Sequence, residues 1–172
     1  MARLIRLLRL PILAVVAAAS LALTTQPALA RGPAPLSHQQ ARRLLVLAAR
    51  HHHLNPNFVL AVSYWESGWN QKAVSRTGAV GLMQIEPYTA AWAGPRFLHH
   101  RADLRNPVDN AELGAALLRD YLDRLHDPKL ALAAYYQGLR GVQLHGIYPS
   151  SRAYVDGIWR LRNRFQAGHY PA

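Results

Sequence analysis

The sequence of 172 residues contains no cysteine and few acidic residues. Without cysteine no disulfide framework can form, so packing alone must hold the fold together. Nine Asp and Glu residues, of which three are Glu, accompany 20 Lys and Arg residues and give a formal net charge of +11. Such an excess favours an anionic partner, although a generally basic surface without a specific partner explains it equally well.

The apolar stretch near the N-terminus is too short for a membrane span. Three arginines precede an apolar segment at 11–23, and an Ala-Leu-Ala pattern ends at Ala30. A span needs about 20 consecutive apolar residues, which leaves a membrane anchor as the weaker alternative. We therefore predict a signal peptide at 1–30 and a periplasmic or secreted protein. For an exported protein, the cell wall or a membrane surface is a better anionic partner than nucleic acid.

Helix start and stop signals divide the remainder into one mostly helical domain. Gly32, Pro33 and Pro35 indicate a flexible leader at 31–36. The length suits a single globular domain at 37–172, with about six helices. Helices are expected at 37–50, 57–66, 88–92, 107–125, 129–137 and 152–165, with loops at 96–105 and 141–149. Five of the starts are marked by capping residues: Ser37 with Gln40, Asn55-Pro56, Asn106-Pro107, Asp127-Pro128 and Pro149-Ser150-Ser151. Gly94-Pro95 should end the third helix, and Val108 should lie in the core.

Glu66 continues an apolar stripe of the second predicted helix. Val59, Val62 and Glu66 share one face at helical spacing, and Gly68 ends the helix. Burial and the negative end of the helix dipole both raise a carboxyl pKa, and a protonated acid can donate to a leaving oxygen. The alternative is a solvent-facing Glu at a helix end, which describes most Glu residues.

The segment after Glu66 is rich in glycine and extended in character. Gly78 and Gly81 allow the backbone to turn tightly or to approach a ligand. The run Leu82–Ile85 is apolar apart from Gln84. We therefore expect a small extended segment beside the acid.

Four motifs follow one another between about residues 44 and 162. They are Glu66-Ser67, Ser75 with Gly78-Ala79 and then Gly81-Leu82-Met83-Gln84, Ala134-Tyr135-Tyr136-Gln137-Gly138, and a looser Tyr154-Val155. In this order they resemble the signature of the soluble lytic transglycosylase family, whose lysozyme-like enzymes cut bacterial peptidoglycan. Tyr136 and Gln137 stand where the family usually has Asn and Ala. The resemblance implies a mainly α, lysozyme-like α+β fold.

The resemblance also implies a role for each matched residue. Glu66 would protonate the glycosidic oxygen between N-acetylmuramic acid and N-acetylglucosamine. It would then act as base while the muramic acid C6 hydroxyl closes a 1,6-anhydro ring. The groove residues would be Met83 and Gln84, with Tyr135 positioning Glu66 or a substrate group, Tyr136 and Gln137 near the substrate, and Ser75 ordering the turn beside the acid. For Tyr135 the alternative is a helical core aromatic.

Few acids remain for a second catalytic role. Glu86 precedes Pro87 and reads as a helix-start residue, and Glu112 reads as solvent-facing in the middle of a helix. Ordinary glycosidases use two acids, so the sequence favours the single-acid mechanism that the resemblance implies. Two alternatives remain: a goose-type lysozyme-like hydrolase, in which a base activates water, and a non-catalytic peptidoglycan-binding module.

Three consecutive histidines at 51–53 close the first predicted helix. Adjacent residues on a helix point in different directions, so we expect no metal site there and no cofactor. The expected partner is the glycan strand of peptidoglycan, with neither nucleic acid nor stable membrane insertion after signal cleavage. The sequence does not predict the oligomeric state.

Overall fold

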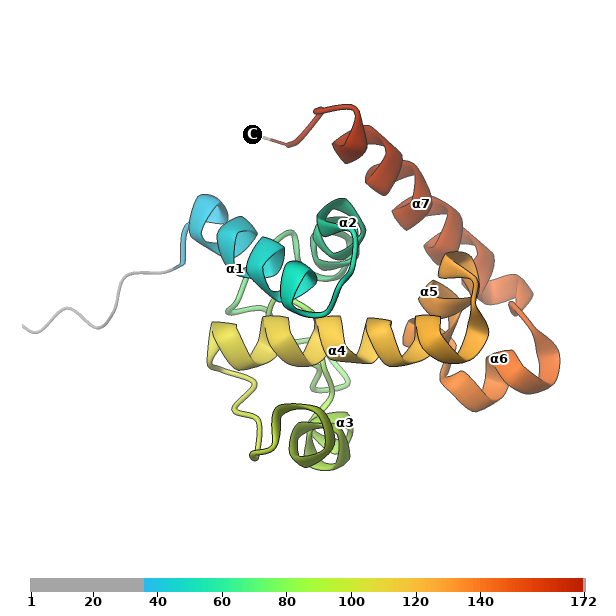
Figure 1. Ribbon diagram of the computed structural model, residues 1–172, viewed down its shortest axis with the longest axis horizontal. Coiled ribbons are helices and arrows are strands. Elements are labelled where there is room, and N and C mark those ends of the chain that lie inside the picture. Colours follow the sequence, from blue (N-terminus) through green and yellow to red (C-terminus); the bar gives the residue numbers. More distant parts are fainter. Residues whose placement is uncertain (1–35, 172) are drawn as a thin grey trace, which may run out of the picture. The chain divides into compact units, whose positions relative to one another are not determined.

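The computed structural model describes residues 36–171, and this part of the chain is mainly helical (Figure 1). The predicted signal peptide at 1–30 and nearly all of the leader lie outside the described residues and stay predictions. The elements are α1 His38–His51, α2 Pro56–Ser67, α3 Pro87–Ala93, the π-helix η1 Gly94–Leu98, α4 Pro107–Leu125, α5 Pro128–Gln137, α6 Leu139–His145, the 3-10 helix η2 Pro149–Ser151 and α7 Arg152–Gln166. Within the described residues, no helix is long and apolar enough to cross a membrane.

Side-chain caps set the starts of four helices where the sequence predicted them. Ser37 and Gln40 form a capping box on α1. The side chains of Asn55, Asn106 and Asp127 each accept a hydrogen bond from a backbone N–H in the first turn of α2, α4 and α5. Each is followed by Pro at the first helical position, where the missing N–H costs nothing. These starts are confirmed.

The core lies where α2 and α4 meet their neighbours. α2 packs against α1 and α7, whereas α4 packs against α1, α3 and α5 (Figure 1). The largest fully buried side chains include Leu45, Val59, Leu60, Trp69, Leu118, Leu132, Ile158 and Phe165. Because these come from five helices and from the turn after α2, removing any one element would expose apolar surface on several others.

The segment between α2 and α3 is extended only in short pieces. Val80 forms isolated antiparallel bridges with Val74 and with Ile85. The buried Asn110 of α4 fixes this segment, because its Nδ2 donates to the carbonyls of Val80 (2.8 Å) and Leu104 (3.1 Å) and its Oδ1 accepts from the N–H of Met83 (2.8 Å). Gly81 has φ +82 and lies directly against the Asn110 amide, so a side chain there would be both strained and blocked.

The predicted loop at 141–149 is wrong, because residues 139–145 form helix α6. Gly141 lies inside this helix, where a Cβ would lie 3.0 Å from the hydroxyl of Tyr148. Val142 supplies the buried anchor, and Gly146 ends the helix with φ 65. Gln137 braces the far end by donating to the Gly146 carbonyl (2.8 Å) and accepting from the Tyr148 N–H (3.1 Å). Tertiary packing thus overrides the helix-breaking tendency of glycine.

Three smaller expectations also differ from the structure. Gly94-Pro95 does not end the helical path after α3, because the chain continues as the π-helix η1. Val108, expected in the core, is 48% exposed in the first turn of α4. Ser151 precedes α7 without a side-chain cap, since the 3-10 turn η2 leads directly into the helix.

Candidate active site

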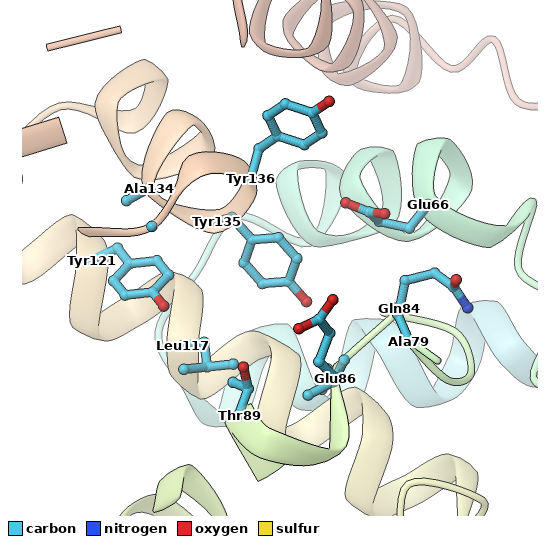
Figure 2. A pocket seen from close by; sticks show the side chains of 12 residues that line it. Glu66, Ala79, Gln84, Glu86, Thr89, Leu117, Tyr121, Ala134, Tyr135 and Tyr136 are labelled. Atoms are coloured by element: carbon cyan, nitrogen blue, oxygen red, sulfur yellow. The ribbon is translucent and has the colours of Figure 1, made fainter. Parts of the chain in front are cut away.

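Glu66 lies in the last turn of α2 and faces a cleft of about 390 Å³ (Figure 2). Val59 and Val62 on the same stripe are fully buried, so the row leads the carboxylate inward as the sequence predicted. Gly68 adopts the left-handed conformation that ends the helix. The cleft is lined by Glu66, Ala79, Gln84, Ile85, Glu86, Thr89, Leu117, Tyr121, Ala134, Tyr135, Tyr136 and Gly138.

Burial raises the pKa of the Glu66 carboxyl above its usual value. A smaller opposing effect comes from Tyr154 on α7, whose hydroxyl donates a hydrogen bond to Oε1 of Glu66 (2.5 Å) and favours the charged form. Desolvation dominates, so the acid holds its proton to higher pH than an exposed Glu does. This is the property that a general acid needs near neutral pH.

The hydroxyl groups of Tyr135 and Tyr154 donate hydrogen bonds to different acceptors near Glu66. The Tyr135 hydroxyl donates to the carbonyl of Met83 (2.7 Å), so it braces the backbone of the extended segment. The Tyr154 hydroxyl binds Glu66 itself. Burial, followed by the charge of Glu66, raises the pKa of both phenols well above the usual value. Both phenols are therefore neutral hydrogen-bond donors at neutral pH.

Gln84 lies in the cleft wall, but the side chain of Met83 does not. Met83 is fully buried and packs against Gly114 of α4, where a Cβ would collide with it. The expectation that its side chain lines the groove is therefore wrong. Met83 contributes its backbone carbonyl, which accepts the hydrogen bond from Tyr135. Gln84 has φ 47 and donates to the carbonyls of Ala73 (3.2 Å) and Gly81 (3.0 Å). It shapes the wall of the cleft by holding this turn.

Ser75 and Gln137 support the cleft from outside the set of described residues that line it. The hydroxyl of Ser75 accepts from the N–H of Ala79 (3.0 Å) and shares a hydrogen bond with Thr77 (2.9 Å). Ser75 therefore orders this turn, and its effect on the surroundings of Glu66 stays a prediction. The amide of Gln137 is occupied by Gly146 and Tyr148.

Glu86, Thr89 and Tyr121 also line the cleft, although no sequence motif predicted them there. Glu86 precedes α3 as expected, but its side chain caps nothing, and its carboxylate points into the cleft (Figure 2). Its position two residues after Gln84 was the available signal. None of the described lining residues is Lys, Arg or His, so a cleft with two carboxylates opens in a chain of net charge +11.

The histidine pattern also differs from the sequence expectation. Nδ1 of His51 and Nε2 of His52 lie 2.7 and 3.0 Å from the same oxygen of Glu112. Helix α1 ends at His51 and His52 already has cap geometry, so helical spacing no longer separates the two rings. Glu112 is consequently paired and only partly exposed, which corrects its expected solvent-facing position.

The chain matches the family model of the transglycosylase SLT domain over residues 44–153. It belongs to this family. The match covers the Glu66 block, the Gly81–Gln84 block and the Tyr135 block, and ends one residue before Tyr154. The resemblance inferred from the motifs is thereby confirmed.

Relatives of known name or structure agree. A transglycosylase of Enterobacteria phage PRD1 is 40% identical over 91 residues, which are 53% of this chain and 32% of that protein. The endo-type membrane-bound lytic murein transglycosylase A of Klebsiella pneumoniae is 37% identical over 127 residues, 69% of this chain and 56% of that protein. This chain therefore spans only about a third to a half of these relatives.

The fold is that of solved lytic transglycosylases. An inactive Glu-to-Gln mutant of the lytic transglycosylase Slt from Pseudomonas aeruginosa superimposes with a TM-score of 0.67 and 26% identity over 80% of this chain and 25% of that one. The 70 kDa soluble lytic transglycosylase from Escherichia coli gives a TM-score of 0.66 at 24% identity, over 78% of this chain and 25% of that one. The predicted mainly α, lysozyme-like fold is confirmed.

Proposed function

We propose that this domain is a peptidoglycan lytic transglycosylase with Glu66 as its only catalytic acid. The main support is the Glu66 carboxyl, which is half-buried at the wall of a cleft, has a raised pKa and accepts a hydrogen bond from Tyr154. The chain also belongs to the SLT family. The names of the relatives support the reaction class. The Pseudomonas aeruginosa relative described as inactive after a Glu-to-Gln change supports an essential glutamate.

In the proposed mechanism one carboxyl group serves twice. Protonated Glu66 gives its proton to the oxygen between N-acetylmuramic acid and N-acetylglucosamine, and the acetamido group of the substrate assists the break at C1. The Tyr154 hydroxyl stabilises the carboxylate that results. Glu66 then takes the proton of the muramic acid C6 hydroxyl, whose oxygen bonds to C1. A 1,6-anhydro end forms, and no water is consumed.

Glu86 gives a specific reason to keep a hydrolase as the second candidate. A lysozyme-like hydrolase needs a second group that activates water, and Glu86 is the other carboxylate that faces the cleft (Figure 2). In that reaction water would replace the C6 hydroxyl as the nucleophile. The two reactions differ in the sugar end that they leave, so product analysis separates them.

Mass spectrometry of muropeptides released by the protein from purified peptidoglycan tests the proposal. We expect anhydromuramic ends, about 18 Da lighter than hydrolysed ends because no water is added, and none with Glu66→Gln. Reducing ends that disappear with Glu86→Gln would instead establish the hydrolase. Binding to peptidoglycan without any product would leave only a binding module.

We also propose that the chain acts after export, in the periplasm or outside the cell, on glycan strands. Support comes from the charged and apolar pattern of residues 1–30. N-terminal mass spectrometry of protein recovered outside the cytoplasm should give Arg31 as the first residue. An N-terminus at Met1 in that fraction would contradict signal cleavage.

A further inference from the structure

Tyr136 stacks on the tyrosine that holds the catalytic acid. The rings of Tyr136 and Tyr154 lie 4.6 Å apart between centroids at an interplanar angle of 23°. On another side Trp65 packs edge-on against Tyr154, with 6.3 Å between centroids and an angle of 86°. Tyr154 is thus enclosed by two aromatic rings and is only 6% exposed. Its hydroxyl, held in this enclosure, meets Oε1 of Glu66.

Tyr136 itself is 58% exposed, so one part of its surface covers Tyr154 while the rest faces the cleft and solvent. A stacked ring restricts the rotation of Tyr154 and keeps water away from the hydrogen bond beneath it. The Asn that the family usually has at this position has no ring with which to do this. Desolvation is also the largest effect on the Glu66 pKa.

We propose that Tyr136 is a positioning residue, which fixes the Tyr154 hydroxyl on Glu66 by stacking and shields that pair from water. The proposal rests on Glu66 being the general acid. It differs from a direct role in substrate binding, because Tyr136 then acts through Tyr154. The other titratable groups that share the cleft with Glu66 are Glu86 before α3, Tyr121 on α4 and Tyr135 on α5.

Steady-state kinetics of Tyr136→Ala and Tyr136→Phe on soluble glycan strands, measured across pH, test this role. Tyr136→Phe keeps the stack and should stay within about twofold of wild type. Tyr136→Ala should lower kcat about tenfold with little change in KM. Loss of the shield hydrates Glu66 and lowers its pKa, whereas a loosened Tyr154 hydrogen bond raises it. Because desolvation is the larger of the two effects on Glu66, the alkaline limb should move to lower pH. An increase in KM alone, with the pH profile unchanged, would show that Tyr136 is a substrate contact.

A double-mutant cycle keeps the test sharp. If Tyr136 acts through the Tyr154 hydroxyl, Tyr136→Ala should cost less in kcat in a Tyr154→Phe background than in wild type. Fully additive losses would overturn the proposal. Tyr88→Ala, which removes an exposed tyrosine of α3, controls for general loss of surface aromatics. Should the wild type prove inactive, NMR titration of Glu66 still decides: its pKa should be lower in Tyr136→Ala than in Tyr136→Phe.

A second, independent observation concerns the cluster of His51, His52 and Glu112. One ligand atom from each residue lies within 4.8 Å of the others, and both imidazole nitrogens already contact the same carboxylate oxygen. His52 and Glu112 are largely enclosed, whereas the His51 side chain is 73% exposed and leaves the cluster open to solvent. α1 and α4, which carry His51 and Glu112, pack against each other.

We infer that this cluster binds a divalent transition-metal ion, with zinc as the best match. Two imidazoles and one carboxylate form a known zinc ligand set, and ligands at about 2.0–2.2 Å stand roughly 3.3–3.6 Å apart in a tetrahedron. The two N–O separations of 2.7 and 3.0 Å need to open by less than an ångström, and the two nitrogens already lie within 4.8 Å of each other. The fourth ligand would be water on the open side. Such an ion would link α1 to α4 without entering the cleft lining.

Calorimetric titration of the protein with zinc chloride tests this site. We expect one ion per chain and at least a tenfold loss of affinity, by about 1.4 kcal/mol, with Glu112→Gln and with His52→Asn. His126→Asn, which changes an exposed histidine outside the cluster, should bind like wild type. Circular dichroism confirms that each variant is folded. Absence of binding at about 100 μM zinc, or binding that these variants leave unchanged, would contradict the inference.

Discussion

Glu66 and Glu86 line the same cleft, yet only Glu66 is withdrawn from water. Glu66 ends a helix whose inner stripe is fully buried, and a tyrosine from a distant helix closes over it. Glu86 stands at an exposed helix start and caps nothing. The same side chain is thus given a different environment by the fold, and only at Glu66 does burial raise the carboxyl pKa and favour the protonated form that a proton donor needs.

Replacement of Glu66 should have the largest effect on the reaction. Glu66→Gln keeps the size of the side chain but removes the transferable proton, so kcat should fall about 100- to 10,000-fold. Release of muropeptides from purified peptidoglycan measures it, and the melting curve shows that the fold is intact. Substantial activity in this variant would show that Glu66 is not the catalytic acid. Glu86 would then be the next candidate for that role.

Loss of Asn110 should damage the wall that carries Gln84 and Glu86 while leaving α2 in place. Asn110→Ala removes the three buried hydrogen bonds described above. It should lower the free energy of unfolding by about 3 kcal/mol, roughly a 100-fold change in the folding equilibrium. Urea denaturation measures it. Asn163→Ala, at an exposed position on α7, should change stability by less than about 0.5 kcal/mol.

Tyr154→Phe sharpens the comparison, because it makes the surroundings of Glu66 still more apolar. The hydrogen bond from Tyr154 favours the charged carboxylate, so its removal raises the pKa of Glu66 further. The alkaline limb of the pH profile should move to higher pH, opposite to the shift expected for Tyr136→Ala. Maximal kcat should fall about 10- to 100-fold, since a bond to a developing charge is lost. An alkaline limb at the wild-type pH would show that Tyr154 does not affect the pKa of Glu66.

Glu86→Gln should have the smallest effect if the single-acid mechanism holds. The side chain keeps its length and its hydrogen-bonding capacity, so kcat should stay within about threefold of wild type and the anhydro ends should persist. Kinetics combined with product masses measure both quantities. A loss comparable with that of Glu66→Gln would give the cleft two working acids.

Local signals were sufficient for most of the helices and for the inward placement of Glu66. They were not sufficient where the structure depends on contacts distant in sequence, or where glycine inside a helix suggested a loop. The caps at Asn55, Asn106 and Asp127, and the stripe that leads to Glu66, depend on residues within a few positions and were predicted. Met83 was misplaced because its burial depends on Gly114 of α4. Helix α6 was missed because Gly141 suggested a loop, whereas the flanking residues Gln137 and Tyr148 support a helix there. Glu86 reaches the cleft because Asn110 of α4 holds the extended segment that precedes it.

The hydrogen bond from Tyr154 to Glu66 joins residues 88 positions apart. A ribosome that has completed α2 has made the carboxylate but not the phenol that closes over it. The acid therefore acquires its final surroundings only when α7 docks on α2. In the unfolded chain, Glu66 is an ordinary solvated side chain. Its raised pKa is therefore a property of the completed tertiary structure, which no segment made before α7 can have.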